Sequence, residues 1–167
     1  TTLPEDDIIC EYLNLQKIKF FRGSSEDVLD RYYQCAKEFS LENIVRITAD
    51  NPLIDPNVID IIIDKYKNNK CDIVSNSIHR TFPYGTEVEV FSFKTLERTW
   101  KNAVKKSERE HVTPYIRNSD TFAKASLSHT EDLSSQRWSV DEPEDLIVVT
   151  NIFEHFSPNI LFNWKQV

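Results

Sequence analysis

Residues 43–56 read NIVRITADNPLIDP, and this stretch decides the fold that we expect for the chain. Residues 43–48 are apolar enough to predict a β-strand that is buried on both sides. Asp55-Pro56 then places a good N-cap residue before a proline at the first helical position. A buried strand that leads through a turn into a helix is typical of α/β proteins.

The same pattern extends toward the N-terminus and beyond residue 56. Apolar side chains recur at helical spacing in three segments, and short apolar or alternating runs separate them. The sequence thus predicts helices over residues 4–15, about 25–39 with Ser24 or Ser25 as its cap, and 56–66, and strands at 17–21, 43–48 and 72–76. This alternation predicts parallel strands with right-handed crossovers and helices on the sheet faces.

The second half of the chain is less regular but contains the same two kinds of element. It predicts strands at 87–93, 122–128 and 137–140, and helices at 94–105, at 107–117 with an interruption at Pro114, and from Pro143 onward. Because no repeat or low-complexity linker divides the sequence, we expect one mixed α/β domain over residues 1–167.

Composition excludes several classes of function. The net charge of −7 argues against a nucleic-acid-binding groove, and no apolar run approaches the length of a membrane span. The three cysteines are far apart and show no C-x-x-C spacing, which predicts buried free thiols in a cytoplasmic protein. They are Cys10, Cys35 and Cys71.

Two aspartates that follow predicted strands are candidates for a metal site. Asp50 follows the strand at 43–48, and Asp141 follows the strand at 137–140. The carboxyl ends of strands are where open α/β sheets bind ligands, and Mg²⁺ uses one or two carboxylates together with phosphates and water. The alternative is that Asp50 and Asp55 cap turns and that Asp141 caps the last helix.

Only two glycines, Gly23 and Gly85, occur in the chain, so neither a P-loop nor a G-x-G-x-x-G turn can be built. The segment from Phe21 to Tyr32 combines a predicted strand end, a glycine turn and a helix N-terminus. Its polar side chains could form a pocket for a base or ribose. The alternative is a surface turn with an Asp27–Arg31 pair at i,i+4 spacing.

Two further segments contain candidate substrate-binding residues. Residues 81–89 include Glu87 and Glu89, and residues 107–115 include Arg109 and His111. Arginine pairs bidentately with carboxylates, so the second segment could bind an acidic substrate. The alternative for His111 is a hydrogen-bonded packing role.

Taken in order, these segments resemble the spore-coat polysaccharide cytidylyltransferase family, whose members are related to CMP-KDO synthetase and acylneuraminate cytidylyltransferase. The resemblance runs over nearly the whole chain. It is carried by FRGS at 21–24 with DVLDRY at 27–32, RITADNPLID at 46–55, SEREHVTPY at 107–115 and RWSVDEPED at 137–145.

The resemblance implies a nucleotide-diphospho-sugar transferase fold, a three-layer α/β/α sandwich around a mixed sheet. It implies transfer of CMP from CTP to an acidic sugar of the 2-keto-3-deoxy type for surface polysaccharide synthesis, with release of pyrophosphate. It also implies a homodimer through residues 80–135. Its site would consist of Asp50 and Asp141 as Mg²⁺ ligands and catalytic residues, Arg22, Ser24 and Arg31 around the nucleotide, and Glu87, Arg109 and His111 around the sugar.

One departure from the family pattern is large. Members of the family open with a strand and a basic loop of the type A-R-x-x-S-x-R-L-P-x-K, and no such segment occurs among the 167 residues. We therefore expect the first βα unit of the fold to be missing and this chain to be inactive alone. The alternatives are another sugar nucleotidyltransferase, a glycosyltransferase, which the missing Asp-x-Asp disfavours, and a non-catalytic subunit.

Overall fold

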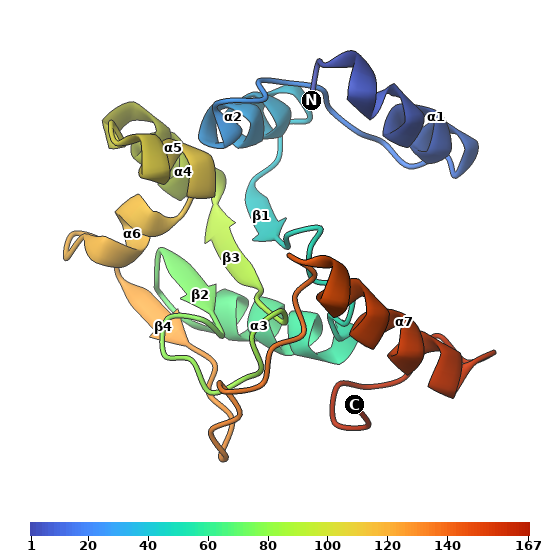
Figure 1. Cartoon of the computed structure of the whole chain (residues 1–167). Helices are drawn as coiled ribbons and strands as arrows, with labels where there is room; N and C mark the ends of the chain where they lie inside the picture. The colour runs from blue at the N-terminus through green and yellow to red at the C-terminus, as the bar shows by residue number, and fades with distance from the viewer. The chain divides into compact units, whose positions relative to one another are not determined.

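The computed structural model describes residues 1–167, and the chain divides into two compact units (Figure 1). The first, which we call the helical unit, comprises Thr1–Ile44 and Ser92–Thr121. The second, the sheet unit, comprises Val45–Phe91 and Phe122–Val167. None of the helices combines the length and the apolar character required to cross a membrane.

The helical unit contains five α-helices and one short 3-10 helix. These are η1 (Pro4–Asp6), α1 (Asp7–Leu15), α2 (Val28–Glu38), α4 (Phe93–Asn102), α5 (Lys106–His111) and α6 (Pro114–Asn118). The helix predicted at the N-terminus is confirmed, as is the break at Pro114. Proline lacks an N–H group and begins a helix more readily than it continues one, which explains both boundaries.

The core of the helical unit lies between α2 and α4. Leu29, Tyr33 and Ala36 form the buried face of α2. The Tyr33 ring stacks on the Trp100 ring of α4 with a centroid separation of 4.2 Å, and the Trp100 indole N–H donates to Asp30 Oδ1 at 2.8 Å. The half-buried indole of Trp100 thus has its polar atom paired while its ring packs on Tyr33.

The strand predicted at residues 17–21 is wrong. This segment is irregular: Lys17 has a positive φ of 57°, and the Ile18 N–H donates to the Leu13 carbonyl at 2.9 Å to close the end of α1. Alternation of polar and apolar residues makes a strand only where a neighbouring strand supplies backbone partners, and the segment has none. Helix α1 buries none of its residues.

The sheet unit is built on a mixed sheet with the order β1-β3-β2-β4. The strands are β1 (Asn43–Arg46), β2 (Ile73–Ser75), β3 (Glu89–Ser92) and β4 (Lys124–Ser126), and β1 and β3 each lead from one unit into the other. β2 runs antiparallel to β3 and parallel to β4, with Val74 opposite Val90 and Ala125 in the two pairings.

Helix α3 (Pro56–Asn68) packs against β2 (Figure 1). Helix α7 (Pro143–Phe156) is the last helix of the sheet unit. The core cluster joins the buried face of α3 to one face of the sheet and to aromatic side chains from the loops. Its buried members are Val58, Ile62, Val74, Phe82, Val88, Val90 and Trp164. Full burial of each such side chain contributes roughly 1.5–3 kcal/mol relative to exposure.

Several sequence expectations need correction. β1 is an edge strand rather than a strand buried on both sides, and Val45 is 41% exposed. The cap of α2 is Asp27, which accepts from the Asp30 N–H at 2.9 Å, rather than Ser24 or Ser25. Residues 137–140 form only an isolated bridge between Arg137 and Tyr84. The three cysteines are free, as predicted, but only partly buried, and burial raises the pKa of the Cys35 and Cys71 thiols.

Candidate active site

The two aspartate turns meet within the sheet unit. The Val140 N–H donates to the Asp50 carbonyl at 2.8 Å, so the backbone that precedes Asp141 lies directly against the turn that contains Asp50. Both aspartates are exposed at this junction. The backbone therefore brings the two turns together, and the expectation that both carboxylates bind one Mg²⁺ stays a prediction.

Neither aspartate serves as a helix cap. The cap position of α7 is Glu142, and Asp145 Oδ2 accepts from the backbone N–H groups of Asp141 and Glu142 at 3.0 and 2.9 Å. These two hydrogen bonds lower the pKa of the Asp145 carboxyl. A lowered pKa means that the cap contributes stability above the ordinary carboxyl range and loses it only as the pH falls through that lower value.

The cap of α3 is Asp55, as the Asp55-Pro56 pattern predicts. Its Oδ1 accepts from the Asn57 N–H at 2.7 Å, and its Oδ2 accepts from the Trp164 N–H at 2.9 Å. Asp55 is only 3% exposed, so these hydrogen bonds satisfy a buried carboxylate. Structural capping in this turn is therefore carried by Asp55, which leaves Asp50 for another role.

The carboxylate of Asp141 is held in place by two donors. Arg137 Nη2 and Ser139 Oγ donate to Asp141 Oδ2 at 2.9 and 2.8 Å. Arg137 Nη2 also contacts Asp145 Oδ2 at 2.9 Å. The second oxygen of Asp141 accepts no hydrogen bond from these groups.

A second network supports the Asp50 turn. Asn51, which is 5% exposed, donates from Nδ2 to Glu87 Oε2 at 3.1 Å. Glu87 Oε2 also accepts from the Gly85 N–H at 2.9 Å, and Glu87 Oε1 pairs with Arg80. Glu87 is predicted as a substrate-binding residue. In the structure it supports the turn that contains Asp50, and both of its carboxylate oxygens already have partners.

Glu89, which the sequence groups with Glu87, has a different environment. It is 2% exposed, and its Oε2 pairs with Arg46 Nη1 at 2.9 Å. A buried carboxylate with a charged partner is a structural feature of the sheet.

The candidate nucleotide-binding residues belong to the helical unit. All three donor nitrogens of Arg22 contact the N-terminal segment: Nε donates to the Thr1 carbonyl at 2.6 Å, Nη2 to the Leu3 carbonyl at 2.8 Å and Nη1 to Asp7 at 2.6 Å. Ser24 and Arg31 contact each other, since Arg31 Nη1 donates to the Ser24 carbonyl at 2.6 Å. The structure therefore brings Ser24 and Arg31 together in one turn.

The Asp27–Arg31 pair, which is the alternative for this turn, is not formed, because Asp27 pairs with Arg109. Arg109 Nε and Nη2 donate to Asp27 Oδ2 at 2.9 and 2.6 Å, and Arg109 Nη1 donates to the Trp100 carbonyl at 2.8 Å. Arg109, which lies on α5, therefore uses its donors to link α5 to α2 and α4. His111 lies exposed at the end of α5 rather than in a packed position.

Replacing Asp27 separates its two contributions. Asp27→Asn retains a capping oxygen but loses the charge opposite Arg109, so we expect a loss of about 1 kcal/mol, given the partial exposure of the pair. Asp27→Ala also loses the cap, which adds about 1 kcal/mol. Urea denaturation of both variants measures the difference, and equal midpoints for Asn and Ala would contradict a capping role.

The motif at residues 137–145 contains Arg137, Ser139 and Asp145, but the sequence assigned these residues no individual role, and it did not point to Arg80. Arg137 and Asp145 lie on either side of Asp141 in the same segment, and this spacing could have indicated that they contact it. Arg80 gave no such signal, because its contact with Glu87 depends on the loop that returns from residue 80 to Gly85.

Comparison with known proteins assigns the family. A family model described as cytidylyltransferase matches residues 2–151. An uncharacterized protein of Methanocaldococcus jannaschii is 40% identical over 159 residues, which cover 93% of this chain and 64% of that protein. The spore coat polysaccharide biosynthesis protein SpsF of Bacillus subtilis is 28% identical over 155 residues, which cover 89% of this chain and 62% of SpsF. The chain thus spans less than two thirds of the length of either relative.

Solved structures agree with this assignment. A cytidylyltransferase from Leptospira borgpetersenii superposes with a TM-score of 0.94 and 29% identity, over 99% of this chain and 71% of that chain. The molybdopterin-guanine dinucleotide biosynthesis protein A of Archaeoglobus fulgidus shares the fold, with a TM-score of 0.56, 16% identity, and coverage of 90% and 76%. This chain belongs to the cytidylyltransferase family and has the mixed α/β fold of nucleotide-diphospho-sugar transferases.

Proposed function

We propose that the protein transfers CMP from CTP to an acidic sugar, for the synthesis of a surface polysaccharide. A sugar hydroxyl oxygen forms a bond to the α-phosphorus of CTP, the bond from that phosphorus to the bridging oxygen breaks, and pyrophosphate leaves. The hydroxyl proton passes to solvent. The observation that carries the proposal is the hydrogen bond from Val140 to Asp50, which sets two exposed aspartate turns side by side.

The donor set of these turns suits a hard divalent cation. Asp50 offers a carboxylate that accepts no hydrogen bond in the structure, and Asp141 offers its second oxygen. Carboxylate oxygens are the protein ligands that Mg²⁺ prefers, and the ion usually takes phosphates and water as well. When bound, Mg²⁺ would neutralise phosphate charge during the transfer.

The remaining candidate residues differ in whether their side chains are free to contact a substrate. Ser24 and Arg31 would contact the nucleotide from the helical unit, and Arg22, whose donor nitrogens are engaged by the N-terminal segment, would contribute its positive charge. Glu87 would act through Asn51 on the Asp50 turn, because its oxygens are already engaged. Arg109 has donors committed to Asp27 and to Trp100, whereas His111 is exposed and has a ring available for a substrate.

We also propose that the protein acts in the cytoplasm as a homodimer that uses residues 80–135. The free cysteines are compatible with a reducing compartment. Light scattering after size exclusion tests the dimer, since it gives the mass of the species directly. A mass near the 19.6 kDa of one chain would contradict it.

Nucleotide selectivity tests the reaction class. In the presence of Mg²⁺, CTP is expected to raise the melting temperature more than UTP does, and chelation of Mg²⁺ is expected to remove the difference. Equal protection by CTP and UTP would favour another sugar nucleotidyltransferase. No protection by any nucleotide would favour a non-catalytic subunit.

Turnover tests the expectation that this chain is inactive alone. The family's basic loop supplies positive charge to the triphosphate, and the 167 residues contain no segment of that type. We therefore expect no pyrophosphate release above background from CTP and a 2-keto-3-deoxy sugar acid. Release at a rate typical of such enzymes would contradict this expectation and support the reaction itself.

A further inference from the structure

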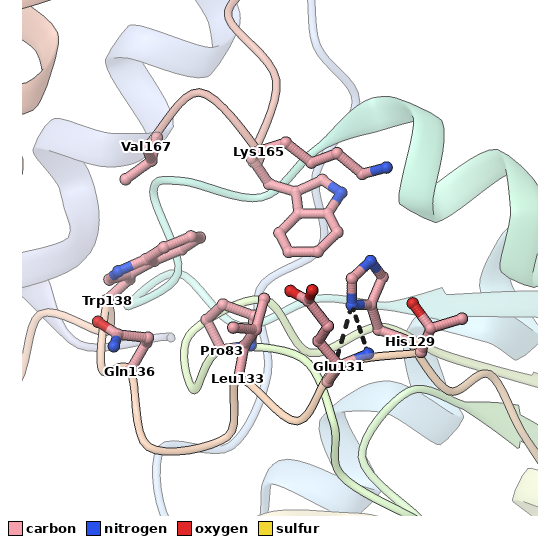
Figure 2. A pocket seen from close by; sticks show the side chains of 10 residues that line it. Pro83, His129, Glu131, Leu133, Gln136, Trp138, Lys165 and Val167 are labelled. Carbon is pink, nitrogen blue, oxygen red and sulfur yellow. Dashed lines mark hydrogen bonds between the residues drawn. The ribbon is translucent and has the colours of Figure 1, made fainter.

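A pocket within the sheet unit has the composition of a small-molecule site (Figure 2). Its volume is about 490 Å³, in the range of pockets that bind small ligands. Trp138 and Trp164 both line the hollow, and Figure 2 shows Trp138, Pro83 and Leu133 around it. Such walls are suited to a ligand with an apolar face.

The rim of the pocket supplies polar groups that have no other partner. Glu131, Gln136 and Lys165 are exposed, and none of their side chains makes a hydrogen bond or an ion pair in the structure. Lys165 Nζ lies 5.9 Å from the Trp164 ring centre. A carboxylate, an amide and an ammonium group around apolar walls provide an acceptor, a donor and acceptor pair, and a positive charge.

The walls of the pocket are held by contacts with one another and with residues behind them. The Trp164 ring packs against Phe82 and His129 with centroid separations of 5.1 Å each. The Glu131 N–H donates to His129 Nδ1 at 3.2 Å, which orients that ring (Figure 2). The Trp138 N–H donates to the Tyr84 carbonyl at 2.7 Å. A pocket whose walls are fixed in this way loses little conformational entropy on binding.

The pocket lies close along the chain to the proposed metal turn. Trp138 and Asp141 are three positions apart, so the two Cα atoms are at most about 11 Å apart. Another hollow of about 490 Å³ in the sheet unit, lined by Phe153 and residues 160–163, has only Asp55 as a charged group. That carboxylate is already used by Asn57 and by the Trp164 backbone.

We propose that the pocket in Figure 2 binds the acceptor sugar as an acidic pyranose. The C–H face of the ring packs against Trp138, because the face of an aromatic ring attracts partly positive hydrogens, whereas Trp164 is only 9% exposed and forms part of the wall. Gln136 donates to and accepts from the sugar hydroxyls, Glu131 accepts from them, and Lys165 pairs with the sugar carboxylate. The role as acceptor site rests on the proposed function, whereas sugar binding by the pocket does not.

Titration in the absence of nucleotide tests the pocket. The probes are glucuronic acid and a 3-deoxy-2-keto sugar acid, each compared with glucose, and the readouts are tryptophan fluorescence and saturation-transfer NMR. We expect the acids to bind with a Kd on the order of 1 mM, as suits a single monosaccharide. Saturation should reach the ring C–H protons first.

Three variants decide the assignment. Gln136→Ala is expected to weaken binding of an acid at least about fivefold, the loss of one hydrogen bond. Lys165→Gln is expected to remove the preference for the acids over glucose. Gln16→Ala, exposed in the helical unit, is the matched control and should leave Kd unchanged.

Two outcomes would overturn the proposal: no binding of either acid, or binding that neither Gln136→Ala nor Lys165→Gln alters. These titrations also separate the pocket from the reaction. Binding of an acid without any CTP selectivity would support the pocket as a sugar site and contradict its role as the acceptor site. CTP selectivity without sugar binding would support the proposed reaction and show that the acceptor binds outside this pocket.

Discussion

Gly85→Ala is expected to destabilise the protein by about 3 kcal/mol or more and to lower its melting temperature by roughly 6–12 °C. Gly85 has a φ of +96°, which a residue with a side chain rarely adopts. A Cβ atom there would lie 2.4 Å from the Ser139 nitrogen and 2.6 Å from the Trp138 carbonyl carbon. These are backbone atoms, so relief requires the two segments to separate.

Separation would break the hydrogen bonds that join these segments. The Tyr84 N–H donates to the Gln136 carbonyl at 2.8 Å, and the Trp138 N–H donates to the Tyr84 carbonyl at 2.7 Å. Because Ser139 holds Asp141, the variant should also lose metal affinity. A folded variant with native stability and native metal binding would show that the close approach at Gly85 is not required.

The other glycine provides a matched control. A Cβ at Gly23 would lie 2.8 Å from Phe21 Cε1 and 2.9 Å from Arg31 Cγ, both of which belong to side chains. These side chains can shift only in part, because Arg31 Cγ lies near its own backbone and Arg31 Nη1 is bonded to the Ser24 carbonyl, but Gly23 does not need a positive φ, so Gly23→Ala should cost less than Gly85→Ala. Thermal and urea unfolding of both variants measure the difference, and a larger loss at Gly23 would contradict the argument.

Local signals in the sequence were sufficient for elements whose boundaries depend on a few adjacent residues. Helix α3 begins at Pro56 with Asp55 as its cap, and helix α7 begins at Pro143, as the sequence predicts. A cap and a proline act within one turn, so distant residues do not change the outcome. The spacing of apolar residues in this segment also predicts which face of α3 is buried in the core.

Elements that need distant partners could not be fixed in this way. The segment at residues 17–21 alternates like a strand but has no neighbour to pair with, whereas β3 has β2 as an antiparallel partner. Asp27 pairs with Arg109, 82 residues away, instead of the nearer Arg31. In each case a contact that forms only in the folded chain decides the structure, and no local pattern specifies it.

The candidate site shows the same division. The likeness to a known family, rather than spacing alone, gave Asp50 and Asp141 a common role, and the backbone hydrogen bond from Val140 places their turns together. Glu87 and Glu89 looked equivalent because they are two residues apart. The structure places Glu89 inside the sheet against Arg46 and Glu87 behind Asn51, which depends on where β3 begins.

Asp50→Asn and Asp141→Asn are each expected to weaken binding of Mn²⁺, used as a probe for Mg²⁺, by about 10²-fold. Replacement of residues that only support metal ligands already costs about 10–100-fold, so loss of a ligand charge should reach the upper end of that range. Electron paramagnetic resonance of free Mn²⁺, with and without CTP, measures the affinity without any turnover. The double variant should lose little more than either single variant, because one ion needs both carboxylates.

The same variants should hardly change stability, and this contrast is what identifies a binding residue. The Asp50 carboxylate accepts no hydrogen bond in the structure, so Asp50→Asn should stay within about 0.5 kcal/mol of the parent protein. The Arg137–Asp141 pair is about half exposed on both sides, so its loss should cost no more than about 1 kcal/mol. Asp120→Asn, an exposed carboxylate in the helical unit, is the control for nonspecific charge effects on Mn²⁺. If Asp120→Asn weakens Mn²⁺ binding as much as Asp141→Asn does, the ion responds to net charge and the two aspartates do not form its site.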